Sequence, residues 1–119
     1  VNALLSSGAD FSQVDTIISN NDDMALGAIE ALKQAGVDIS KMKIVGVDGI
    51  NTGLQAILDG DMTATVFQNA SGQAAAALQA AINLASKQEV NAGISYELDG
   101  HTIWIPFEKV TADNVKEYY

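Results

Sequence analysis

The fold is decided by residues 14–36, which read VDTIISNNDDMALGAIEALKQAG. Residues 14–19 are a short run rich in β-branched side chains, which is typical of a strand. Polar residues follow at once, and then Ala25, Ile29 and Leu32 recur on one helical stripe that stops at Gly36. Glycine relieves the steric cost of a positive φ and commonly ends a helix. The stretch therefore predicts a strand that leads directly into a capped helix.

The same plan occurs twice more along the chain. The second unit has a strand at 43–47 and a helix that stops at Gly60; the third has a strand at 64–67 and an alanine-rich helix over 73–86, capped by Ser71. Successive strand-helix units imply right-handed crossovers and a parallel sheet. We therefore expect an α/β fold, with a parallel sheet of strand-helix units covered by helices on both faces.

The end of the sequence breaks this pattern. Two β-prone runs, at 94–98 and 102–105, flank an Asp-Gly pair at 99–100. A two-residue Asp-Gly loop between such runs is a specific hairpin signal. We expect a C-terminal β-hairpin there, followed by a short final helix that Thr111 or Asp113 would cap.

Length and composition limit the number of domains and the class of partner. The 119 residues are 48% hydrophobic, enough for one core, so a single domain over 1–119 is expected. The net charge of −9 disfavours nucleic acid, and the lack of cysteine excludes disulfides and thiolate metal sites. No apolar run is long enough to cross a bilayer. Residues 1–8 resemble the end of a helix closed by Gly8, which indicates that the chain is a fragment.

Polar side chains follow each of the three predicted strands. The carboxyl ends of parallel strands meet at one edge of the sheet, where ligands bind in open α/β folds. Carboxylates accept from vicinal hydroxyls and amides both donate and accept, so this set suits a neutral polyol better than a phosphate. Any one of these residues could also be a helix cap or turn former. The strand-end residues are Asn20, Asn21, Asp22, Asp23, Asp48, Gln68 and Asn69.

Three stretches carry a resemblance to a known family. They read IISNNDDMALGA at 17–28, VGVDG at 45–49 and ATVFQN at 64–69. They resemble the periplasmic sugar-binding proteins of ABC importers, of the glucose/galactose- and ribose-binding type. The likeness runs over essentially the whole chain, including IWIPF at 103–107. It implies a type I periplasmic binding protein lobe, with this chain as the later part of the C-terminal lobe of a two-lobe protein.

The resemblance also implies a function and a site. It predicts the solute-binding component of a carbohydrate ABC transporter, which holds a monosaccharide between two lobes through Asn21, Asp48 and Gln68. Galactose-type members usually carry asparagine at the third position and ribose-type members glutamine, so galactose, glucose and ribose all stay open. The implied partner is the transporter's permease, and the implied location is the periplasm or, in a Gram-positive bacterium, a cell-surface lipoprotein. The isolated fragment would expose apolar surface and could form a homodimer.

Enzymatic and metal-dependent functions find little support in the sequence. Asp15 aligns with an acidic residue of a calcium site in some galactose-binding members, but calcium needs six to eight oxygens, so neither metal nor cofactor is expected. The acidic pair at 22–23 and Asp48 imitate the acidic cluster of a phosphoryl-accepting receiver domain. A receiver also needs a lysine after a later strand, where this chain has Gln68 and Asn69. A Ser-His-acid arrangement is lacking because the single histidine, His101, lies in the hairpin. We expect a binding protein and not an enzyme.

The alternative interpretation is the effector-binding domain of a LacI-type transcription regulator. That family shares the fold and the Asn-Asp-Asp-Met-Ala-Leu-Gly style of motif. Its members usually have a proline-bearing loop before the third strand, where this chain has Asp59-Gly60-Asp61-Met62, and they lack the hairpin tail. A signal sequence upstream would identify a transport protein, and a helix-turn-helix would identify a regulator.

Overall fold

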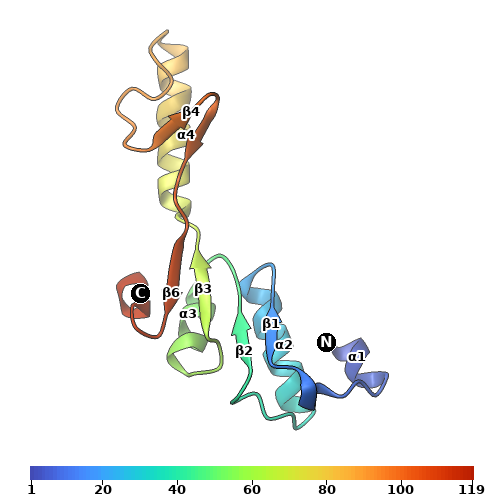
Figure 1. Ribbon diagram of the computed structural model, residues 1–119. Helices are drawn as coiled ribbons and strands as arrows, with labels where there is room; N and C mark the ends of the chain where they lie inside the picture. Colours follow the sequence, from blue (N-terminus) through green and yellow to red (C-terminus); the bar gives the residue numbers. More distant parts are fainter. The chain divides into compact units, whose positions relative to one another are not determined.

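A four-stranded sheet organises residues 1–67 together with residues 108–119 (Figure 1). The computed structural model describes residues 1–119, which form two compact units: Val1–Phe67 with Glu108–Tyr119, and Gln68–Phe107. This division does not test the prediction of a single domain over 1–119, which stays a prediction.

The sheet of the first unit has the strand order β1-β2-β3-β6. Its strands are β1 (Thr16–Ile18), β2 (Lys43–Val45), β3 (Ala64–Phe67) and β6 (Glu108–Thr111). The first three are parallel, with Ile17 opposite Ile44 and Val45 opposite Ala64. The predicted parallel arrangement of the strand-helix units is therefore confirmed.

Strand β6 was not predicted from the sequence. It pairs antiparallel with β3, and Lys109 lies opposite Val66, so the sheet is mixed. Val110 is fully buried, whereas Glu108 and Lys109 are exposed. Two charged residues in a strand of four conceal its apolar pattern. Thr111 ends this strand, so the prediction that it caps the final helix is wrong.

The predicted final helix is one short 3-10 turn, η2 (Val115–Tyr118). It follows Asn114 and not Asp113, and the Asn114 side chain closes the turn after β6 through two hydrogen bonds to that strand. Tyr118 packs on Phe67 of β3, with ring centroids 5.1 Å apart. The C-terminal residues are thereby attached to the sheet of the first unit.

Helices α2 (Asp22–Gln34) and α3 (Asn51–Leu58) connect the parallel strands. Both helices end just before the predicted glycines. Gly36 has a φ of 73° and Gly60 a φ of 81°, values that favour glycine at a helix end. The two helices contact each other, which places them on the same face of the sheet. The third predicted covering helix belongs to the second unit, so the cover of both faces stays a prediction. The core that they cover consists of Phe11, Ala25, Ile29, Leu32, Met42, Ile44, Leu54, Ala56, Ile57, Met62, Val110 and Val115.

The chain reaches the edge strand β1 through two short helices, α1 (Asn2–Ser6) and η1 (Phe11–Gln13). Gly8 follows α1 with a φ of 81°, as expected for a helix end. Successive strand residues point to opposite faces, so Ile17 packs on the core while Ile18 is 80% exposed. The homodimer of the isolated chain stays a prediction.

The second unit begins with α4 (Ala70–Ala85). The helix starts earlier than predicted because Asn69, and not Ser71, is its cap: the Asn69 Oδ1 accepts from the Gly72 N–H at 2.8 Å. Asn83, which is buried, donates to the carbonyls at 90 and 92 and holds the loop that follows the helix. None of the helices in the chain is long and apolar enough to span a bilayer.

The predicted hairpin is present as β4 (Glu97–Asp99) and β5 (Thr102–Trp104). The two-residue loop is 100–101 and not 99–100, because Asp99 pairs with Thr102. Gly100 supplies a φ of 59° in that loop, a value that favours glycine.

Candidate ligand-binding site

Asn21 lies where β1 gives way to α2. Its backbone is extended, with a φ of −152°, and its Oδ1 accepts from the Met24 N–H at 2.9 Å. Asn21 is therefore the N-cap of α2, one of the two roles that the sequence left open. The cap fixes the side chain at the carboxyl edge of the sheet and leaves the Nδ2 group as the donor that Asn21 can offer to another molecule.

Asp48 follows β2 and has an unusual backbone. Its φ is 114°, in a region that non-glycine residues rarely adopt. The Asp48 N–H donates to the Val66 carbonyl at 2.8 Å, and Asp48 forms a parallel bridge with Phe67. Gly49 must stay glycine, since it has a φ of 73° and a Cβ would lie 2.7 Å from Phe67 Cδ2. The strained backbone of Asp48 costs about 1–3 kcal/mol, and residues strained in this way cluster at functional sites.

The buried carboxylate of Asp22 accepts hydrogen bonds from the turn that contains Asp48. Asp22 has no exposed surface, and its Oδ2 accepts from the backbone N–H groups of Gly49 at 2.9 Å and Ile50 at 3.0 Å. Its Oδ1 accepts from the Thr65 hydroxyl at 2.6 Å, and its own N–H donates to the Val47 carbonyl at 2.8 Å. One residue at the start of α2 thus bonds to the chain before and after Asp48.

Sequence reasoning grouped Asp22 with its polar neighbours and did not single it out. A signal was nevertheless available: Asp22 is three residues before Ala25 and seven before Ile29, so it lies on the buried stripe of α2. A carboxylate on that stripe has to enter the core and needs donors there. Gly46 and Gly53 make room for it, because a Cβ at either position would overlap the Asp22 side chain.

The structure brings Asn21 and Asp48 to one edge of the sheet. They flank the hydrogen bond from the Asp22 N–H to the Val47 carbonyl, which joins the start of α2 to the segment after β2. Gln68 follows Phe67 directly in the chain and is the first residue of the second unit. The ligand-binding roles of all three residues stay predictions.

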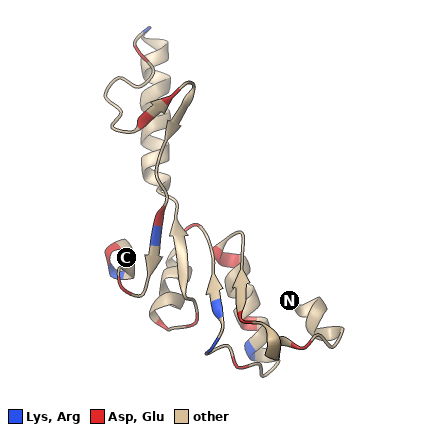
Figure 2. Ribbon diagram, in the orientation of Figure 1, with Lys and Arg blue, Asp and Glu red and all other residues tan.

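The charge of this edge suits an uncharged ligand with many hydroxyls. The loops after β1 and β2, residues 19–21 and 46–50, contain Asp48 and no basic residue. Lys43 begins β2, at the end of the strand away from these loops (Figure 2). Carboxylate and amide groups form charge-assisted or two-centre hydrogen bonds to hydroxyls. An anionic ligand would meet repulsion from Asp48.

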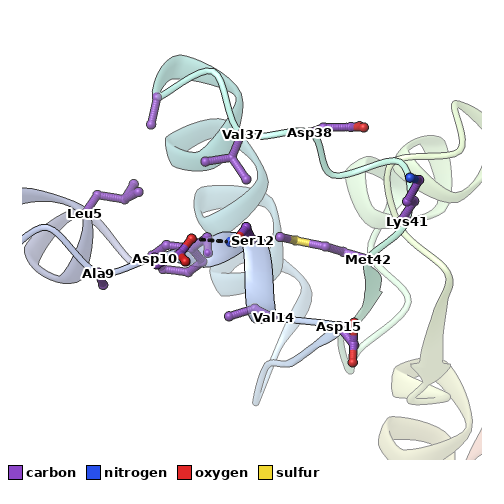
Figure 3. A pocket seen from close by; sticks show the side chains of 12 residues that line it. Leu5, Ala9, Asp10, Ser12, Val14, Asp15, Val37, Asp38, Lys41 and Met42 are labelled. Atoms are coloured by element: carbon purple, nitrogen blue, oxygen red, sulfur yellow. Dashed lines mark hydrogen bonds between the residues drawn. The ribbon is translucent and has the colours of Figure 1, made fainter.

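A separate pocket of about 670 Å³ lies at the amino end of the sheet (Figure 3). Its lining includes Asp10, Asp15, Asp38 and Lys41. Hydrogen bonds from Ser12 lower the pKa of Asp10, and the Ser40 N–H likewise lowers the pKa of Asp38. Asp10 and Asp38 thus stabilise their own loops. No group of three metal-binding side chains occurs in the chain. Asp15, the residue that aligned with a calcium site, lies here and not near Asp48.

The sequence matches a known family over residues 1–89, described as the periplasmic binding protein domain. The chain belongs to this family. Among curated relatives of this periplasmic binding protein, the D-galactose/methyl-galactoside binding periplasmic protein of Haemophilus influenzae is 38% identical over 118 residues, 99% of the chain and 34% of the relative. A xylitol-binding protein of Mycolicibacterium smegmatis is 37% identical over 103 residues, 87% of the chain and 26% of the relative.

Solved structures of periplasmic binding proteins share the fold. An ABC transporter solute binding protein of Bacillus halodurans with bound myo-inositol has a TM-score of 0.77 and 34% identity, over 98% of the chain and 36% of that protein. The predicted fold class, a type I periplasmic binding protein with α/β architecture, is confirmed. The relatives are sugar-binding proteins of ABC transport. The chain spans about a third of the length of the curated relatives it matches.

Proposed function

We propose that this periplasmic binding protein chain contributes Asn21, Asp48 and Gln68 to the binding of a monosaccharide or a closely related polyol. The intact protein would be the solute-binding component of a carbohydrate ABC transporter. It would act in the periplasm or as a lipoprotein on the cell surface, and deliver its ligand to the transporter's permease. No covalent step is needed, because the predicted groups donate and accept hydrogen bonds only.

The observation that carries the proposal is the backbone of Asp48. A non-glycine residue at a φ of 114° raises the energy of the folded state. The Asp48 side chain therefore has to make a contribution that glycine, which would adopt this φ without strain, could not make. The strain holds a carboxylate at the carboxyl edge of the parallel strands, where ligands of open α/β sheets bind. A carboxylate at this place can accept from two adjacent hydroxyls of one sugar ring.

Asn21 and Gln68 complement this carboxylate with amide groups. The Asn21 Oδ1 already accepts from the Met24 N–H, so its Nδ2 would donate to a hydroxyl or ring oxygen. Gln68 would both donate and accept. The relatives bear on the ligand class, since their names cite galactose and methyl-galactoside, xylitol and myo-inositol. All are uncharged and rich in hydroxyls, which fits the lack of basic residues in the loops after β1 and β2.

The features that the chain shares with the regulator family, the fold and the motif at 21–27, are shared with the transport family too, so they do not favour a regulator. The relatives described above are solute-binding proteins, and the predicted hairpin that distinguishes the transport family is present as β4 and β5. The effector-binding domain of a LacI-type regulator is therefore not proposed.

The test is a thermal-shift screen of the full-length protein against D-galactose, D-glucose, D-ribose, xylitol and myo-inositol. One ligand should raise the melting temperature, because a ligand that binds only the folded state stabilises it in proportion to the logarithm of its concentration over Kd. Asn21→Ala and Asp48→Ala should each abolish that rise. Asp113→Ala, at an exposed position after β6, is the matched control and should keep it.

The screen also has outcomes that count against the proposal. If none of the five ligands shifts the melting temperature, the monosaccharide proposal is wrong. If a ligand shifts wild type and both variants equally, the ligand binds elsewhere and the roles assigned to Asn21 and Asp48 are wrong.

A further inference from the structure

We infer that Asp22 is a positioning residue for the ligand: its buried carboxylate sets the conformation of the 47–50 turn, and through that turn the direction in which Asp48 presents its own carboxylate. The inference rests on the proposed function of Asp48 and adds a residue that does not itself contact the ligand.

The first argument is the pattern of hydrogen bonds around Asp48. The Asp22 carboxylate accepts from the Gly49 and Ile50 N–H groups on one side of Asp48. On the other side, the Asp22 backbone N–H donates to the Val47 carbonyl. A hydrogen-bonded residue on each side leaves the backbone of Asp48 little freedom to rotate toward a φ below zero. Strained conformations persist only where the surroundings over-determine them, and these bonds supply that constraint.

The second argument is burial. Asp22 has no exposed surface, so water cannot replace any of its three partners. A buried carboxylate is stable only when several donors satisfy it, and here two backbone N–H groups and the Thr65 hydroxyl do so. The turn can therefore leave its conformation only by abandoning a buried charge. That makes the turn stiffer than an ordinary surface loop.

The third argument is the space kept around the carboxylate. Gly53 lies in the buried face of α3, and a Cβ there would lie 2.5 Å from Asp22 Oδ2 and 2.7 Å from its Cγ. Glycine inside a helix costs about 1 kcal/mol relative to alanine. Gly46 makes similar room beside Oδ1. The fold thus gives up helix stability to seat this one side chain.

The test is a double-mutant cycle in the full-length protein with Asp22→Asn and Asp48→Asn, using whichever of the five screened ligands binds. An asparagine at position 22 keeps the shape but replaces one accepting oxygen with a donor. Alone it should weaken binding about tenfold or more, as expected for residues of one hydrogen-bond network. In the Asp48→Asn background it should weaken binding less than about twofold, because the carboxylate it positions is already gone.

A core variant separates positioning from loss of stability. Leu32→Ala in α2 removes a fully buried side chain and should lower the melting temperature at least as much as Asp22→Asn, yet leave Kd unchanged below the unfolding transition. If Asp22→Asn weakens binding equally in both backgrounds of the cycle, or leaves Kd as unchanged as Leu32→Ala does, the inference is wrong.

Amide hydrogen exchange gives a readout that needs no ligand, and its wild-type half needs no variant. The Gly49 and Ile50 N–H groups should exchange slowly in the wild-type protein and rapidly in Asp22→Asn. Rapid exchange of both in wild type would overturn the inference even if Asp22→Asn does not fold. A protein with slow exchange that binds no screened ligand would instead refute the proposed function, while the hold of Asp22 on the turn would stand.

Discussion

The two ends of the same sheet use their carboxylates in different ways. At the amino end, Asp10 and Asp38 are exposed, and each accepts a hydrogen bond from a residue two positions ahead, Ser12 and Ser40 respectively. At the carboxyl end, Asp22 is buried and bonds to segments more than 20 residues away in sequence. A local bond orders only its own loop. A bond between distant segments determines how those segments meet, which is what a binding site needs.

The largest effect should follow from removing the buried carboxylate. Asp22→Ala leaves the N–H groups of Gly49 and Ile50 and the Thr65 hydroxyl without their acceptor, which should cost about 3 kcal/mol or more of unfolding free energy. Urea denaturation followed by circular dichroism measures the loss. Asp10→Ala at the amino end is the control and should move the midpoint far less. Equal shifts would remove the contrast between the two ends of the sheet.

The same substitution, glycine to alanine, at one position beside Asp22 and one position away from it tests how tightly the buried carboxylate is packed. Gly53→Ala places a methyl group 2.5 Å from Asp22 Oδ2 and should destabilise the protein by about 2 kcal/mol despite the better helix propensity of alanine. Gly27→Ala on the exposed side of α2 meets no atom within 4 Å and should stabilise by about 0.5–1 kcal/mol. Chemical denaturation of both variants should give opposite signs. A stabilising Gly53→Ala would mean that Asp22 does not occupy that space.

A third prediction concerns the strain at Asp48. Asp48→Gly relieves a φ of 114° and should raise the unfolding free energy by about 1 kcal/mol while it abolishes sugar binding. Thermal denaturation with and without ligand measures both effects. Lys87→Gly, at a φ of 56° after α4, relieves strain away from the predicted site and should also stabilise the protein, but without loss of binding. A destabilised Asp48→Gly would show that the turn is not strained.

The smallest effect concerns protonation at the amino end. Hydrogen bonds from Ser12 hold the pKa of Asp10 below its ordinary 3.8, and the Ser40 N–H does the same for Asp38. A carboxyl whose pKa is lower in the folded state stabilises that state above 3.8, and this contribution disappears as the pH falls through the lower, folded-state pKa. Carbon-detected NMR titration should find both midpoints below 3.8. Ser12→Ala should return the Asp10 midpoint toward 3.8; an unchanged midpoint would contradict the assigned cause.

The sequence was sufficient where the signal is local. Glycine marked the ends of α1, α2 and α3, and β-branched runs marked the three parallel strands, because caps and strand propensity depend on near neighbours. The Asp-Gly pair likewise located the hairpin, although the loop lies one residue further along. Strand β6 was missed because its pairing with β3 spans some 40 residues and its own composition is half charged.

The candidate site was predictable in part for the same reason. Asn21 and Asp48 follow strands, so the topology alone places them at the carboxyl edge. The burial of Asp22 depends on Gly46, Gly53 and Thr65, which come from two other strand-helix units. The positive φ of Asp48 depends on the same long-range bonds, and no local pattern announces it.

The space around the Asp22 carboxylate has a consequence for reading mutational scans of this protein. If every position were randomised and selected for the proposed sugar uptake, Gly46, Gly53 and Thr65 should tolerate as little change as Asp48. A map of intolerant positions would then extend beyond the residues that contact the sugar. Part of it would outline the packing shell of one buried anion, and purifying the failed variants would separate the two groups by whether the protein is still folded.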